Sequence, residues 1–86
     1  MPEIARFYGI VILLHWEEHP PPHFHARYAE WEASIAIDTL QVEGGSLPRR
    51  ALRLVIEWAA SHQQELMDDW QHTQQGLAPK PILPLK

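Results

Sequence analysis

The alternation of hydrophobic and polar positions divides this 86-residue chain into an N-terminal half with strand patterns and a C-terminal half with a helical pattern. Residues 9–16 are almost continuously apolar, which is typical of a central strand buried on both faces. Three consecutive prolines, Pro20 to Pro22, end that run, because proline cannot donate to a strand ladder and favours a stiff extended loop. Residues 23–28 then alternate polar and apolar, as a half-covered strand does.

A hairpin is the next predicted element. The pair Ala29-Glu30 fits a two-residue turn between residues 23–28 and a third strand over residues 31–38. In that register Phe24 faces Ile35, and the alternation agrees on both strands, whereas a slip of one residue would mix the two faces. The polar face then carries His23, His25, Arg27, Glu32, Ser34 and Asp38. Residues 39–43 fit a short edge strand that Gly44-Gly45 ends.

From Pro48 onward the chain has a helical pattern, with proline in the first turn and Gly76 as a stop. Its main apolar stripe contains Leu52, Val55, Ile56, Ala59, Leu66, Met67 and Trp70. We therefore expect a single α+β domain over residues 1–78: an antiparallel sheet of three to four strands with one long C-terminal helix packed on one face. A bend near Ser61-His62 is left open. Residues 79–86 are expected to form a proline-rich extended tail.

Two features of the predicted helix do not follow from packing on one face. Leu54 and Trp58 lie almost opposite the main stripe, so they are either a partner-binding patch or are covered by the proline-rich tail. Arg49, Arg50 and Arg53 crowd the positive end of the helix dipole, which is the reverse of the stabilising arrangement. Guanidinium groups beside free backbone N–H groups favour an anion-binding site for phosphate or carboxylates. The alternative is pairing with Glu43, Glu57 or solvent.

Composition narrows the classes of protein. The net charge of −4 argues against a dedicated nucleic-acid-coating protein, whose affinity depends on many contacts from basic residues to phosphates. The absence of cysteine excludes a disulfide framework and Cys-type zinc fingers. No apolar run is long enough to span a membrane and the N-terminus lacks the basic start of a signal peptide, so we expect a cytoplasmic protein without membrane association.

The strongest chemical candidate is the series His23-x-His25-x-Arg27, because strand alternation places all three side chains on one face. The two imidazoles could share one Zn²⁺, with His15, His19, Glu18 or Glu32 as further ligands. No HExxH motif or third ligand at a diagnostic spacing is present, so no metal or cofactor is assigned. The same residues suit metal-free RNA cleavage, with His23 and His25 as acid and base and Arg27 on the phosphate. A solvated face with an Arg27–Glu32 pair is the third interpretation.

Specific motifs give a resemblance. The chain contains Pro21-Pro22-His23-Phe24-His25, Leu47-Pro48-Arg49-Arg50 and the spaced tryptophans Trp58 and Trp70. In these motifs it resembles a small bacterial and archaeal family catalogued as a domain of unknown function, over nearly its whole length. The family pattern has glycine where this chain has Ala29.

The resemblance also implies a function. Members often occur beside a second small protein, which implies that this chain is the toxin-like component of a two-protein toxin–antitoxin module. Its partner would be a small antitoxin-like protein from a neighbouring gene, and RNA is the candidate target. A homodimer is left open. The resemblance supplies no established catalytic residues, so His23, His25 and Arg27 are candidates on chemical grounds alone, and a non-enzymatic module that binds protein or metal is the alternative.

Overall fold

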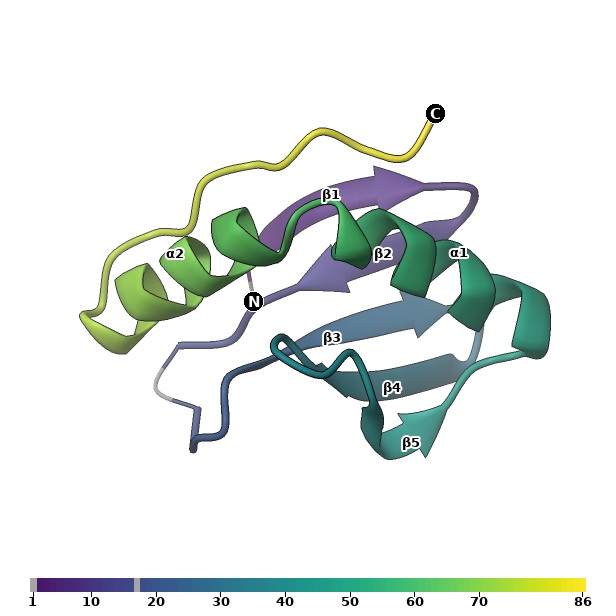
Figure 1. Cartoon of the computed structure of the whole chain (residues 1–86), viewed down its shortest axis with the longest axis horizontal. Coiled ribbons are helices and arrows are strands. Elements are labelled where there is room, and N and C mark those ends of the chain that lie inside the picture. The colour runs from purple at the N-terminus through teal and green to yellow at the C-terminus, as the bar shows by residue number, and fades with distance from the viewer. Residues whose placement is uncertain (1, 17) are drawn as a thin grey trace.

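A five-stranded antiparallel sheet forms the N-terminal half of the protein, and two helices follow it (Figure 1). The computed structural model describes residues 2–16 and 18–86. The strands lie in chain order across the sheet, so every connection joins neighbours. The elements are β1 (Glu3–Phe7), β2 (Ile10–Leu13), β3 (His23–Tyr28), β4 (Trp31–Ala36), β5 (Val42–Ser46), α1 (Arg49–Ala60) and α2 (Gln63–Gln74).

The hairpin of β3 and β4 has the register that the alternation predicts. Phe24 pairs with Ile35 and Tyr28 with Trp31, across a turn in which Ala29 has a φ of 51°. That backbone region favours glycine, which explains why glycine is the expected residue there. Phe24 and Ala26 are fully buried and face the helices, whereas His23, His25 and Arg27 lie on the alternate side of the strand. His23, at the end of β3, still contacts Trp70 of α2.

The expectation of three to four strands is wrong at the N-terminus, where β1 was missed. β1 pairs with β2 through a tight turn at Tyr8 and Gly9, both of which have positive φ values (50° and 79°). Such turns match the right-handed twist of paired strands. Gly9 therefore belongs to a turn and does not begin a buried strand, and the long apolar run becomes the four-residue β2 followed by a loop.

The edge strand is also displaced from its predicted position. β5 covers residues 42–46, so Gly44 and Gly45 lie inside the strand and do not end it. Gly45 has a φ of 70°, and a Cβ atom there would lie 2.1 Å from the carbonyl oxygen of Glu32 on β4. Gly45 pairs with Ala33, and the register shifts one pair further on, between Ser34–Gly44 and Ile35–Val42. The two glycines thus permit a close, irregular pairing that the turn-residue rule does not anticipate.

The single long helix is wrong as well, because the chain breaks at Ser61-His62 into α1 and α2. The side chain of Gln63 donates to the backbone carbonyls of Ile37 and Asp38, at 2.8 Å and 3.1 Å, which ties the break to the loop after β4. His62 lies within 2.6 Å of Glu65, which is in the first turn of α2. Glu65 thus lies at the N-terminal, positive end of a new helix, where a carboxylate is stabilising.

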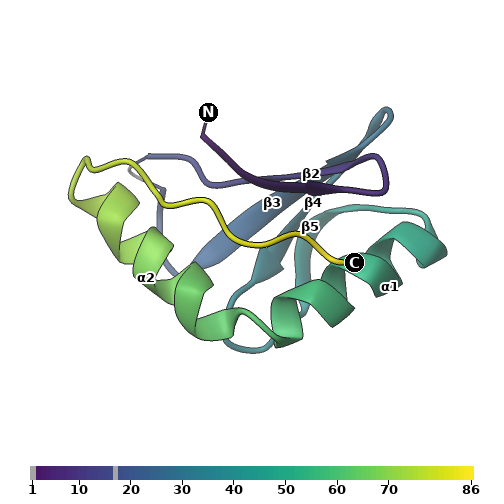
Figure 2. The same ribbon diagram turned by 90° about the horizontal axis from the view of Figure 1, so that it is seen from above.

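Both helices cover one face of the sheet, and the C-terminal segment runs along β1 (Figure 2). The core between the layers includes Phe24, Ile35, Val55 and Trp58. The segment after α2 contains no helix or strand, but Ile82 is 5% exposed and donates its backbone N–H to Ile4 on the outer edge of β1. The segment therefore shields an edge strand that would otherwise be free to pair.

The close approach at Gly45 gives a stability prediction. We expect Gly45→Ala to lower the free energy of unfolding by about 2 kcal/mol or more. Alanine is strained at a positive φ, and its Cβ would also clash with a backbone carbonyl. For a domain of this size that corresponds to a fall in melting temperature of about 10 °C. Thermal melting followed by circular dichroism measures it.

Gly44→Ala is the matched control, because a Cβ atom at Gly44 would meet no heavy atom within 4 Å. We expect it to change stability by less than about 1 kcal/mol. Equal melting temperatures for the two variants would contradict the pairing of Gly45 with β4 described above.

Candidate functional site

Three histidines and two glutamates gather at the end of β3 next to the proline-rich loop. His23 and His25 come from β3, His15 from the segment after β2, Glu18 from the loop and Glu32 from β4. The side chains of His23 and His25 are only 12% and 15% exposed, so this is a covered cluster and not a solvated sheet surface.

His23 is fixed from two sides. Its Nδ1 lies 2.8 Å from the carbonyl oxygen of Pro21, which can only accept, so Nδ1 carries the proton. The ring also packs against the indole of Trp70 on α2, with centroids 5.3 Å apart. In the neutral ring Nε2 therefore keeps its lone pair, and it lies 3.8 Å from a carboxylate oxygen of Glu18.

His25 lies at the centre of the cluster, between two carboxylates. Its Nε2 is 3.1 Å from Glu18 and its Nδ1 is 3.7 Å from Glu32. The rings of His15 and His23 meet it edge-on, with centroids 4.2 Å and 5.1 Å away. Each of these four neighbours can itself bind a proton or a metal ion.

The surroundings of His15 lower the pKa of its imidazole. Burial of the ring lowers the pKa of His15, since water solvates the charged form better, and the nearby His25 lowers this pKa further. The carboxylates of Glu18 and Glu32 act in the opposite direction and do not reverse the shift. The fold thus favours a neutral imidazole at this position.

Arg27, the third member of the predicted series, is held by a neighbour on β4. Its Nε donates to Glu32 at 3.1 Å, and both side chains are 43% exposed. This is the cross-strand pair that the third interpretation expects, and an exposed pair of this kind contributes about 1 kcal/mol or less. Glu32 nevertheless joins Arg27 to His25, so the guanidinium is part of the same network.

The anion-site candidates Arg49, Arg50 and Arg53 do not converge with the histidines. Arg50 lines a separate hollow of about 220 Å³ with Tyr8 and Tyr28, beside the turns at the opposite end of the sheet. His23 and Tyr28 are the two ends of β3, about 16 Å apart for an extended strand. No ion pair among residues 2–16 and 18–86 involves these three arginines, and α1 begins without a side-chain cap. Their anion-binding role stays a prediction.

The partner-binding candidates Leu54 and Trp58 have different surroundings. Trp58 is 1% exposed, packs against Phe7 and Phe24, and donates its indole N–H to the carbonyl of Leu83 at 2.8 Å. Trp58 is therefore buried between the sheet and the tail, so it forms no exposed patch; the tail contacts it as one of the two explanations expects. Leu54 is half-buried and lines the hollow next to Arg50.

Sequence reasoning did not identify one further group of polar residues, formed by Asp69, His72 and Lys80 between α2 and the tail. The spacing of Asp69 and His72 places both on one side of a helix, which is a weak signal. Nothing local shows that the tail returns to Asp69, so the group could not be recognised without the fold.

The fold and this cluster define an α+β protein with a histidine–carboxylate site at one end of its sheet. A family model described as "Domain of unknown function (DUF4160)" matches residues 9–71, and the chain belongs to this family. No curated protein and no solved structure matches the chain. Among the described residues, no helix is long and apolar enough to cross a membrane.

The pKa of His15 gives a prediction on pH. The pKa of His15 is lower in the folded protein than in the unfolded chain, where it is about 6.5. As the pH drops through about 6.5, the unfolded chain therefore binds a proton before the folded protein does, and the free energy of unfolding falls. We expect His15→Gln, which stays neutral, to lose less melting temperature than the wild type between pH 7.5 and pH 5.5. An equal or larger loss in the variant would contradict the assignment.

Proposed function

We propose that this protein binds a divalent transition-metal ion such as Zn²⁺ through Glu18, His23 and His25. The observation that carries the proposal is the bond from the Nδ1–H of His23 to the Pro21 carbonyl, which leaves Nε2 free on the side of Glu18 and His25. Metal-binding histidines are typically held in this way, with the second ring nitrogen donating to a carbonyl or carboxylate.

The set of donors fits such an ion. Two imidazoles and one carboxylate form a common zinc site, in which a fourth position remains for water or substrate. One ligand atom from each of Glu18, His23 and His25 lies within 4.8 Å of the others. Ligands around a tetrahedral zinc ion lie about 3.3 Å apart, so small side-chain movements suffice to close the site.

A second set, His15, His25 and Glu32, meets the same distance criterion. Both sets use His25, whose neutral ring has one lone pair, so they compete for one ion. Glu32 is the more exposed glutamate and is already paired with Arg27, which reduces its negative charge as a ligand. We therefore favour Glu18. In this structure Nε2 of His25 lies 3.1 Å from Glu18, which can only accept, so that nitrogen carries the ring proton. Metal binding at Nε2 requires the proton to move to Nδ1, on the side of Glu32, whose carboxylate is 3.7 Å away and must move closer to accept it.

Titration with Zn²⁺ in a calorimeter tests this function. We expect one ion per chain, and a loss of affinity of at least about 100-fold in His23→Ala and in Glu18→Gln, because each variant removes one of three ligands. Binding should also release protons as the pH falls towards 6, since histidine ligands must be neutral.

His19→Ala is the matched control, because His19 is an exposed histidine of the same loop and belongs to neither set. It should bind Zn²⁺ as the wild type does. If His23→Ala also binds normally while His19→Ala does not, the metal is held by the loop and the proposed site is wrong.

A second proposal concerns the role that the resemblance implies: a toxin-like component of a two-protein module, acting on RNA through His23, His25 and Arg27. The pairing of two histidines with a nearby guanidinium supports this chemistry. The separation of Arg49, Arg50 and Arg53 from the cluster weakens the metal-free version, because fewer cationic groups are available for the phosphate. A metal ion at the cluster would supply that positive charge.

Induced expression in a bacterial host tests the second proposal. We expect wild-type protein to slow growth, co-expression of the neighbouring gene product to restore it, and the double variant His23→Ala/His25→Ala to be harmless while retaining its fold. In an RNA cleavage assay, inhibition by a chelator would indicate the metal-dependent version and insensitivity the metal-free one. Toxicity that persists in the double variant would remove the cluster from the mechanism.

A further inference from the structure

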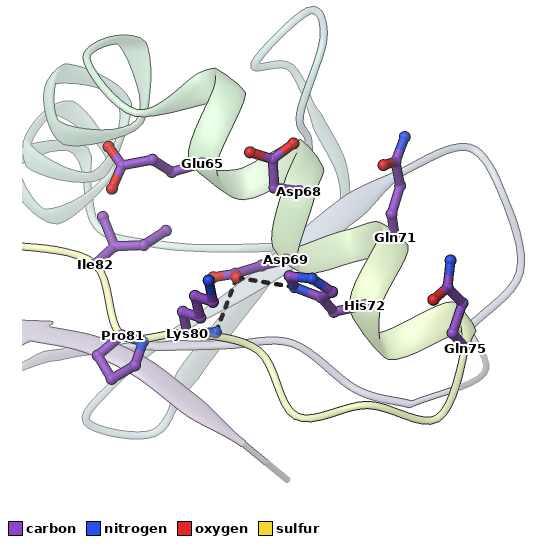
Figure 3. A pocket seen from close by; sticks show the side chains of 9 residues that line it. All are labelled: Glu65, Asp68, Asp69, Gln71, His72, Gln75, Lys80, Pro81 and Ile82. Carbon is purple, nitrogen blue, oxygen red and sulfur yellow. Dashed lines mark hydrogen bonds and ion pairs between the residues drawn. The ribbon is translucent and has the colours of Figure 1, made fainter.

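A second polar site lies between α2 and the C-terminal tail, away from the histidine cluster. It is a hollow of about 410 Å³, and Figure 3 shows residues of α2 on one side and Lys80, Pro81 and Ile82 of the tail on the other. A hollow of this size is sufficient for a small ligand or one long side chain.

Asp69 is the key group of the hollow. The residue is only 3% exposed, and its Oδ1 accepts the backbone N–H of Lys80 at 2.9 Å, as the dashed line in Figure 3 marks. Its other oxygen, Oδ2, is buried and has no hydrogen-bond partner among the described residues. An unpaired buried acceptor is costly, so a donor placed beside Oδ2 would stabilise this carboxylate.

His72 places a second buried polar atom without a partner beside Asp69, and this atom is an acceptor when the proton of the neutral ring is on Nε2. Its Nδ1 is buried without a hydrogen-bond partner and lies 4.0 Å from Asp69 Oδ1, too far for a hydrogen bond. The two residues are three positions apart on α2, so both side chains point to the same side of the helix, towards the tail (Figure 3). A ligand with two donors in one plane could satisfy both atoms.

The charges around the hollow favour a cation. Glu65, Asp68 and Asp69 contribute three carboxylates, against one ammonium from Lys80. Pro81 and Ile82 add an apolar wall suited to methylene groups. The hollow is larger than a bare metal ion needs, and its wall is partly apolar, so an organic cation with an aliphatic stem fits the site better than a metal does.

We propose that this hollow binds a guanidinium group on an aliphatic stem, with Asp69 Oδ2 and His72 Nδ1 accepting its planar N–H donors. Guanidinium is the side-chain cation that donates in a fixed fork, and it loses less hydration energy on burial than ammonium does. The source is either an arginine side chain of a peptide or a free alkylguanidine.

The electrostatics of Asp69 agree with a site that is completed by a cation. Burial raises the pKa of Asp69, and the Coulomb effects of Asp68 and Glu65 act in the same direction, while the Lys80 N–H and His72 oppose them. A guanidinium beside Oδ2 would replace the solvation that burial removes from the carboxylate, and so would favour its ionised form.

Nuclear magnetic resonance titration with N-acetyl-arginine methylamide tests the proposal. We expect saturable shifts of the backbone amides of Asp69, His72 and Lys80, and no saturable shifts with the citrulline analogue, which has the same shape but no charge. n-Butylguanidinium distinguishes the source: tighter binding of the blocked arginine indicates a peptide, and equal or tighter binding of the alkylguanidine indicates a small molecule.

Two variants complete the test. Asp69→Asn keeps an oxygen for the Lys80 N–H but removes the charge, and should weaken binding of the blocked arginine at least 10-fold. Glu57→Gln on α1, which makes the same change at an exposed position outside the hollow, should bind as the wild type does. Equal binding of arginine and citrulline derivatives, or unchanged binding by a folded Asp69→Asn, would overturn the proposal.

Discussion

The strict alternation of side chains along β3 is the constraint on which the rest of the structure depends. Phe24 and Ala26 are buried completely under the helices, so the alternate positions, His23 and His25, lie on the other side of the strand. The same backbone therefore builds the core and presents His23 and His25. A slip of one residue would turn both imidazoles towards the core and Phe24 away from it, so the packing of the core fixes the face on which the site lies.

How much the sequence predicts depends on whether the information is local. The hairpin of β3 and β4 was predicted in its correct register, because a two-residue turn and two alternating strands specify one another. The turn at Tyr8 and Gly9 lies inside an apolar run, where hydrophobicity hides it, so β1 was missed. The break before Gln63 depends on carbonyl groups 25 and 26 residues away, which no helical periodicity can reveal.

The same distinction applies to the functional residues. Strand parity predicted that His23, His25 and Arg27 share a face, and the structure agrees. Parity could not show that the loop brings Glu18 to His25, nor that Arg49, Arg50 and Arg53 lie at the other end of the sheet, since both depend on the path of the chain between elements. Trp58 was ambiguous for a similar reason, because the tail that covers it lies 25 residues later.

Helix α2 links the two polar sites through neighbouring residues. Trp70 packs against the ring of His23, while Asp69 faces the hollow on the side of the tail. Consecutive residues of a helix point about 100° apart, so one rigid turn serves both sites without either sharing a side chain. The ring of His23 is consequently positioned by α2 as well as by the Pro21 carbonyl. The Pro21 carbonyl fixes one nitrogen of the ring, and the indole of Trp70 packs against its face, so two elements far apart in the sequence together restrict the orientation of the imidazole. Trp70 belongs to α2, so the break before Gln63, which lets α2 differ in direction from α1, contributes to the position of this histidine.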